Sequence, residues 1–364
     1  MKKKIVLLII FLGLGIFFVW FSIKDFKPED VQHIQESAEK VLNPKSLVFI
    51  FISIIFAVSA HYFRTLRNIL LIDPLGYRVR KTTAFYSVMV CYLANLAIPR
   101  LGEVLRCTFL QRYDKVPVQK SFGTIVVERV FDLLVFILLL VIVIFLNKGL
   151  LSGLVINKEG ITLGNWIDEK WIWLWSMKYL VLAALIVGFM MLFFVRKYKK
   201  RKQETIKKQS QIVVKIKNII SGLWQGLISV KDLQHPYLFI IYTIAIWVCY
   251  YLGGYFCFFA FDFLKALGDQ MPMAALVVLA VGSIGFMIAQ GGLGAYPLIV
   301  TGVLMLYGVE SRDGFTAGWI GWSAQTIMIL VVGFTTLILS SFLKVEDRAV
   351  KTSNDSLTSS VSKT

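Results

Sequence analysis

Ionisable residues stand at breaks between long hydrophobic stretches of this chain, where their side chains could bind an anion. Arg100, Glu103 and Arg106 follow the apolar run 84–98. A second group opens the next apolar segment and consists of Glu128, Arg129 and Asp132. Guanidinium groups form bidentate hydrogen bonds with phosphate, and charges inside hydrophobic segments are costly enough to suggest function. A lipid phosphate is the anionic partner that this chemistry favours.

The first break also favours the start of a new helix. Pro99 lacks an amide proton and fits the first turn of a helix. If a helix restarts there, Arg100 and Glu103 share one face, and Glu103 and Arg106 share the next. Asn95, one turn earlier, could cap this helix or contact a ligand. A self-neutralised ion-pair cluster at the membrane interface is the alternative.

The second group places two carboxylates one turn apart on one helix face. Glu128 and Asp132 have this spacing, and Arg129 lies beside them. We expect the carboxylates to pair with Arg100 or Arg106 across the break. A proton-coupled switch is the other interpretation.

A second broken segment is rich in glycine. Gly291, Gly292 and Gly294 permit the backbone to turn at the tip of a hairpin, and Gln290 and Tyr296 supply polar contacts. Exposed amides at this tip could hold a lipid headgroup. Tight helix packing through small residues is the alternative.

The composition predicts an all-α, polytopic transmembrane helix bundle. Of the 364 residues, 57% are hydrophobic and 17% are charged, and the mean hydropathy is +0.72. The net charge of +17 is concentrated in a few loops, which indicates membrane topology and anionic lipid partners rather than nucleic acid. The spacing of cysteine and histidine predicts no metal site or disulfide framework, and we expect no cofactor.

Six to eight spans are predicted. The six continuous candidates are 5–23, 46–63, 123–146, 176–195, 236–260 and 314–343. Two further segments, 84–112 and 273–309, are broken and are expected to form re-entrant hairpins. The order of elements then repeats with opposite topology, which is typical of a transporter with a site near the bilayer midplane. The alternative is that 273–290 spans by itself.

Charged residues orient these segments. Lysines at positions 2–4 and the basic loop 64–83 predict the cytoplasmic side, whereas the acidic loop 24–45 predicts the outside. Arg64 and Arg67 are expected to end the second span as anchors that reach the interface, with lipid-headgroup binding as the other possibility. The C-terminus is also expected in the cytoplasm.

The basic segment 196–232 is expected to form a cytoplasmic amphipathic helix on the membrane or on the bundle. It belongs to an integral membrane domain predicted over residues 1–345. The tail 346–364 is rich in Ser and Thr and is expected to be disordered.

The motifs described above resemble the lysylphosphatidylglycerol synthase transmembrane-region family, also called flippase-like, over about residues 5–343. The resemblance rests on three blocks: Asn95, Pro99, Gly102, Glu103 and Arg106; Glu128, Arg129 and Asp132; and Gly291, Gly292 and Gly294. In bifunctional relatives this region is the lipid-flipping half, fused to an aminoacyl-transferase domain that we expect this chain to lack. Stand-alone members are linked to flipping or handling of phospholipids and polyprenyl-phosphate lipids.

Sequence and resemblance together predict a plasma (inner) membrane protein that binds and flips an anionic phospholipid or polyprenyl-phosphate lipid. A lipid-modifying transferase and a scaffold that recruits partners through 196–231 are the alternatives; no catalytic set is evident, which favours a non-enzyme. A separately encoded lipid-synthesis enzyme is a possible partner, and the oligomeric state is not predicted. The expected substrate-binding residues are Asn95, Pro99, Arg100, Gly102, Glu103, Arg106, Glu128, Arg129, Asp132, Gln290, Gly291, Gly292, Gly294 and Tyr296.

Overall fold

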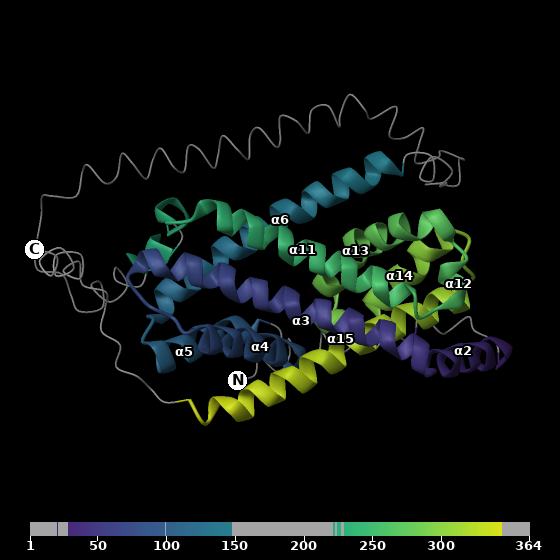
Figure 1. The fold of residues 1–364 in the computed structure, drawn as a ribbon, viewed down its shortest axis with the longest axis horizontal. Helices are drawn as coiled ribbons and strands as arrows, with labels where there is room; N and C mark the ends of the chain where they lie inside the picture. Colours follow the sequence, from purple (N-terminus) through teal and green to yellow (C-terminus); the bar gives the residue numbers. More distant parts are fainter. Residues whose placement is uncertain are drawn as a thin grey trace, which may run out of the picture. The chain divides into compact units, whose positions relative to one another are not determined.

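The regular elements of the described chain are all helices, as the sequence predicts (Figure 1). The computed structural model describes residue 20 and residues 28–98, 100–147, 221–222, 224–226 and 229–343. The chain divides into two compact units, residues 1–140 with 218–364 and residues 141–217. The contacts reported below lie within the first unit.

Five helical stretches of the described residues are long and apolar enough to cross a membrane. They are Pro44–Leu75, Val118–Leu146, Pro236–Phe258, Gly268–Ile288 and Ser311–Ser340. Four of them match predicted continuous spans. The remaining one, Gly268–Ile288, is the first arm of the predicted hairpin at 273–309. The predicted spans 5–23 and 176–195, the basic segment 196–232 and the tail 346–364 lie wholly or mostly outside the described residues.

Two long helices, α3 (Pro44–Ile72) and α11 (Pro236–Phe258), pack side by side in opposite directions. Asn43 caps α3 by accepting a hydrogen bond from the Ser46 amide at 3.0 Å, and Pro44 occupies the first turn. Aromatic contacts run along the pair: Phe49 with Phe259, Phe56 with Phe256, and Phe63 with Tyr242. The antiparallel order of these pairs agrees with a fold built from two inverted halves.

The first predicted hairpin is formed by α4 (Lys81–Ala97) and α5 (Leu101–Asp114), which pack against each other. The Asn95 side chain on α4 accepts a hydrogen bond from the Gly102 amide at 2.8 Å and so caps α5. A Cβ atom on Gly102 would lie 2.0 Å from the Cys91 carbonyl oxygen, so only glycine permits this approach. At the other end, Arg80 pairs with Asp114 at 2.9 Å, and burial raises the pKa of this carboxyl although Arg80 opposes the shift.

The second hairpin is formed by α13 (Met271–Ile288) and α14 (Ala295–Leu306), joined by a short turn, η4 (Gln290–Gly292). Gly291 and Gly292 in this turn and Gly294 just after it all have positive φ angles, between 59° and 73°. The glycine-rich tip therefore turns the chain as predicted, because residues with a Cβ rarely adopt this conformation.

The described residues of this unit contain three more helices of over ten residues and one short helix, α12 (Asp262–Lys265). α6 (Val118–Leu146) follows the first hairpin, and α15 (Ser311–Ser340) follows the second. α15 packs on α14 and α4, so it connects the two hairpins. A shorter helix, α2 (Pro28–Val41), lies in the predicted outer loop and contacts α15, where His33 meets Asp313 at 2.9 Å.

Two predicted boundaries are wrong. The second span does not end at residue 63, because α3 continues to Ile72. Arg64, Arg67 and Asn68 are buried in this extension, and Leu71 and Ile72 pack on α5, α6 and α11. The helix after the first break begins at Leu101 rather than Pro99, because Arg100 adopts a left-handed conformation with φ 63°. Arg100 is therefore outside the helix that carries Glu103 and Arg106.

Candidate functional site

A buried ion pair connects α5 to α6. Both terminal nitrogens of Arg106 donate to Glu128, at 3.0 and 3.1 Å, and the side chains are 3% and 1% exposed. This is the bidentate geometry in which an arginine and a carboxylate satisfy each other. The expected pairing of Glu128 with Arg106 is confirmed, and Arg106 has little capacity left for a phosphate.

Asp132 faces α3 instead of the first hairpin. Its two carboxylate oxygens lie 2.7 Å from Arg64 and 2.8 Å from Arg67. Arg64 and Arg67 are 5% and 0% exposed. The prediction that both arginines reach the membrane interface is therefore wrong, as is the pairing of Asp132 with Arg100 or Arg106, because α3 extends far enough to bring its own cations beside α6.

Arg129 is the most accessible member of this ion-pair network. It donates to Glu103 at 3.2 Å, and Glu103 also accepts a longer hydrogen bond of 3.5 Å from Asn95. The Arg129 side chain is 47% exposed, compared with 3% for Arg106. A guanidinium with one ion-pair contact and this exposure retains donors for another anion.

The network carries an excess of positive charge. Four arginines, Arg64, Arg67, Arg106 and Arg129, meet three carboxylates, Glu103, Glu128 and Asp132. The network therefore carries one net positive charge, because Arg64 and Arg67 share a single carboxylate. Where water is scarce, such a charge is costly unless an anion neutralises it.

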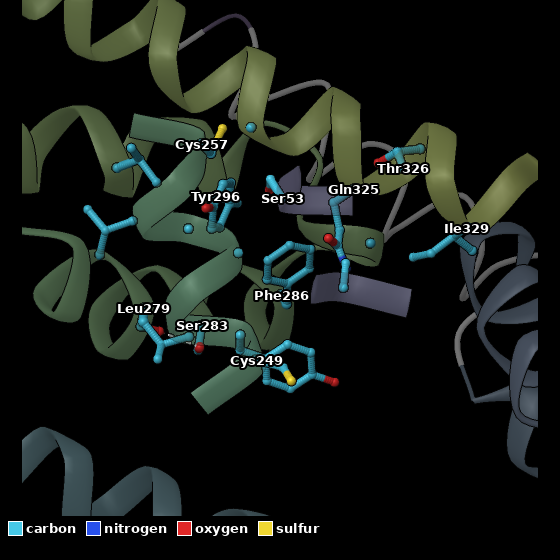
Figure 2. A pocket seen from close by; sticks show the side chains of 18 of the residues that line it. Ser53, Cys249, Cys257, Leu279, Ser283, Phe286, Tyr296, Gln325, Thr326 and Ile329 are labelled. Atoms are coloured by element: carbon cyan, nitrogen blue, oxygen red, sulfur yellow. Dashed lines mark hydrogen bonds between the residues drawn. The ribbon is translucent and has the colours of Figure 1, made fainter. Parts of the chain in front are cut away.

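A cavity of about 420 Å³ lies between the two hairpins and the α3–α11 pair. Its wall is largely apolar and includes Phe286 and Ile329, which Figure 2 shows on opposite sides of Gln325. Polar side chains contribute at separate points of the wall: Ser53, His61, Tyr92, Asn95, Arg129, Tyr250, Ser283, Tyr296, Gln325 and Thr326. A mostly apolar cavity with a few polar groups is the usual form of a small-molecule site.

A second, more open groove of about 430 Å³ lies between α6 and the tip of the first hairpin. Arg100, Glu103 and Arg129 line its polar part. The rest of its wall is apolar and consists of Phe122, Ile125, Val126, Val130 and Leu133. Arg129 thus lines both the groove and the cavity.

The tips of the two hairpins are in direct contact. The Gln290 side chain donates to the Leu96 carbonyl oxygen at 2.7 Å, and Trp322 on α15 donates to the Gly291 carbonyl oxygen at the same distance. Leu96 and Gly291 both line the cavity. The two breaks in the sequence therefore meet at one wall of a single cavity.

The predicted site residues divide into three groups. Asn95, Arg129, Gly291 and Tyr296 line the cavity, and Arg100, Glu103 and again Arg129 line the groove. The others lie outside both and hold the structure around them: Gly102, Arg106, Glu128, Asp132, Gln290, Gly292 and Gly294. Pro99 lies outside the described residues.

Several cavity residues were not in the predicted set. His61, Tyr92 and Tyr250 come from apolar helices, and the spacing of these polar residues in the sequence shows no pattern. Gln325 could have been predicted from the sequence. It is the one amide side chain within the span 314–343, where polar side chains are costly and therefore suggest a function.

The described residues contain no group of three or more metal-ligating side chains. The four cysteines, Cys91, Cys107, Cys249 and Cys257, are buried and free. Glu103 and Glu128, the carboxylates that a lipid-modifying transferase could use as a base, both have partners. Glu128 is engaged by Arg106, and Glu103 is shared between Arg129 and Asn95.

Neither the curated proteins nor the solved structures include a significant match to this chain. A family match, in contrast, covers residues 5–333 and so includes every residue of the ion-pair network, the cavity and the groove. The match agrees with the apolar helices and the paired breaks found in the structure. This multi-pass membrane protein belongs to the family described as the lysylphosphatidylglycerol synthase TM region.

Proposed function

We propose that this protein binds an anionic lipid through its phosphate and moves the headgroup across the membrane through the cavity between the hairpins. The observation that carries the proposal is the position of Arg129, which lines both the open groove and the cavity. A headgroup held by this guanidinium could pass from one space to the other without losing its charged partner.

The charge of the network supports an anionic ligand. Its one excess positive charge would be balanced by a phosphodiester, which carries one negative charge. Arg106 and Glu128 would keep α5 against α6, and Arg64, Arg67 and Asp132 would keep α3 against the same helix. Arg129 and Arg100 remain accessible to bind the phosphate, since Arg100 is exposed and lines the groove.

The groove also has the amphipathic character that a lipid requires. Its charged part lies beside an apolar surface of α6 that includes the exposed side chains of Val130 and Leu133. Acyl chains could remain against this surface, in contact with the bilayer, while the headgroup enters the cavity. Because the chains stay in an apolar environment throughout, the binding free energy would come chiefly from the contacts with the headgroup.

A lipid-scrambling measurement in proteoliposomes tests this function. Fluorescent phosphatidylglycerol in both leaflets is exposed to a membrane-impermeant quencher, and the inner-leaflet signal reports the rate of flipping. We expect Arg129→Gln to lower that rate about tenfold or more, because a hydrogen bond to a charged group is worth about 1.5–3 kcal/mol. Arg129→Lys should retain part of the activity.

Arg112→Gln is the matched control, because Arg112 is exposed on α5 and lines neither space. Its flipping rate should equal that of the unsubstituted protein. Size-exclusion profiles and thermal unfolding verify that the Arg129 variants are folded. An unchanged rate in folded Arg129→Gln, or no flipping of any anionic lipid by the unsubstituted protein, would contradict the proposal.

A further inference from the structure

One wall of the cavity presents a buried histidine whose ring nitrogens are unused. His61 is 1% exposed and lines the cavity, yet neither Nδ1 nor Nε2 has a hydrogen-bond partner among the described residues. Its ring lies 4.3 Å from the Tyr92 ring, centroid to centroid, and this contact involves the ring faces and edges rather than a hydrogen bond. Buried polar atoms are normally paired, so these two nitrogens indicate a ligand.

A second polar group faces the same cavity from α15. The Gln325 side chain extends into the cavity in Figure 2, and its amide has no hydrogen-bond partner within the described parts of the chain. Gln290 at the hairpin tip differs, because its amide is engaged with Leu96. Gln325 therefore has donors and an acceptor that the fold does not use.

The two side chains share one chemical property. A neutral imidazole presents one donor and one acceptor, and a carboxamide presents both kinds of group. A ligand group that both donates and accepts, as a hydroxyl does, can bond to both side chains whichever tautomer and amide orientation they adopt. A primary ammonium group only donates, and a quaternary ammonium group does neither; both would also meet the excess positive charge of the network.

We propose that His61 and Gln325 select a lipid whose headgroup carries a hydroxyl group beside its phosphate. In this arrangement Arg129 binds the phosphate, and the histidine and the glutamine form hydrogen bonds with the hydroxyl. The inference rests on the proposed function and adds the chemical class of the headgroup. Glycerol or sugar on a glycerophospholipid, and sugar on a polyprenyl phosphate, share this chemistry.

Competition between lipids of equal charge tests the inference directly. The purified protein is titrated with equimolar phosphatidylglycerol and phosphatidylethanol, and native mass spectrometry gives the ratio of the two bound lipids. Both lipids are anionic phosphodiesters, but only the first has headgroup hydroxyls. A second competition compares polyprenyl phosphoglucose with the ethyl ester of polyprenyl phosphate. Both are phosphodiesters with one negative charge, and only the first carries hydroxyl groups.

We expect about a tenfold preference for the hydroxylated lipid in at least one of these pairs, since a site built to hydrogen-bond a hydroxyl discriminates against an analogue that lacks it. His61→Phe keeps an aromatic ring beside Tyr92 but removes both nitrogens, so the preference should fall to about one while anionic lipid still binds. His61→Gln restores a donor and an acceptor and should recover part of the preference.

Gln325→Leu provides an independent variant if His61→Phe does not fold, and it should lower the preference in the same way. His235→Phe and Gln225→Leu are the controls, because both positions are exposed and lie outside the cavity; each should retain the full preference. A preference that survives in folded His61→Phe and folded Gln325→Leu overturns the inference.

The outcomes separate the two proposals. Equal binding of the lipids in both pairs by the unsubstituted protein overturns the selection of a hydroxyl and leaves anionic lipid binding intact. No saturable binding of any of the four lipids overturns the proposed function and this inference with it.

Discussion

The side-chain amide of Gln290 donates a hydrogen bond to the main-chain carbonyl of Leu96 over 2.7 Å, and the two residues are 194 positions apart in the chain. This bond joins the tips of the two hairpins at the wall of the cavity. Any movement that opens the cavity between the tips must break it or carry both tips together.

Gln290→Leu should therefore destabilise the protein. The Leu96 carbonyl would lose its side-chain partner in a partly buried position, which costs about 1–3 kcal/mol. Thermal unfolding of the purified protein measures the effect. Gln225→Leu removes an exposed glutamine that bonds to Ser221 within the described part of the chain, and it should leave the midpoint nearly unchanged. Equal effects of the two substitutions would show that the tip contact contributes little.

The Arg106–Glu128 pair should behave as a buried ion pair in a double-mutant cycle. Arg106→Met or Glu128→Leu alone leaves one charge without its partner, and each should lower the stability by about 3–5 kcal/mol. The double variant should recover most of that loss, because two apolar side chains can replace a buried pair at little cost. Additive losses, measured from the unfolding midpoints of all four proteins, would mean that the two residues do not stabilise the fold as a pair.

Gly102→Ala should disrupt the first hairpin. The added Cβ would lie 2.0 Å from the Cys91 carbonyl oxygen and 2.7 Å from the Asn95 side-chain oxygen that caps α5. Gly302→Ala on α14 is a matched control, because nothing lies within 4 Å of its Cβ position, and it should stabilise the helix by up to about 1 kcal/mol. Unfolding midpoints should thus move in opposite directions, and a tolerated Gly102→Ala would refute the close approach of α4 and α5.

The side of the membrane reached by the second hairpin tip can be determined by labelling. If 273–309 is a re-entrant hairpin that enters from outside, Leu293→Cys should react with an impermeant maleimide only from that side, and a charged blocking reagent should prevent it. Lys115→Cys, at the far end of α5, should react only from the cytoplasm. The native cysteines are all buried, which keeps the background low.

Reaction of Leu293→Cys only from the cytoplasm would reject this topology. It would show that Gly268–Ile288, which is long and apolar enough to cross a membrane, spans by itself.

Much of this fold could be predicted from the sequence, because the length of an apolar run and the residues that interrupt it are local features of the chain. Four of the five long apolar helices of the described residues were predicted as continuous spans, and the two hairpins and the turn of the glycine-rich tip were also predicted. The asparagine cap was also foreseen, since Asn95 lies one turn before the break. These features depend on residues within a few positions of one another.

The parts that failed depend on contacts between distant helices. Arg64 and Arg67 looked like interfacial anchors because their partner, Asp132, lies more than sixty positions away on another helix. His61 and Gln325 face the same cavity from α3 and α15, and no local pattern connects them. The charge and spacing of the residues predicted an anion site. Which arginines are accessible and which are buried could be seen only from the packing of the helices.

The contact between the hairpin tips also has a consequence for how this family could vary. Its donor is a side chain, but its acceptor is a main-chain oxygen that every amino acid supplies. A substitution at position 96 leaves the bond possible, whereas one at position 290 removes it. Evolution is therefore constrained at one of the two positions only, and residues 96 and 290 are not expected to covary although they hold the two halves together.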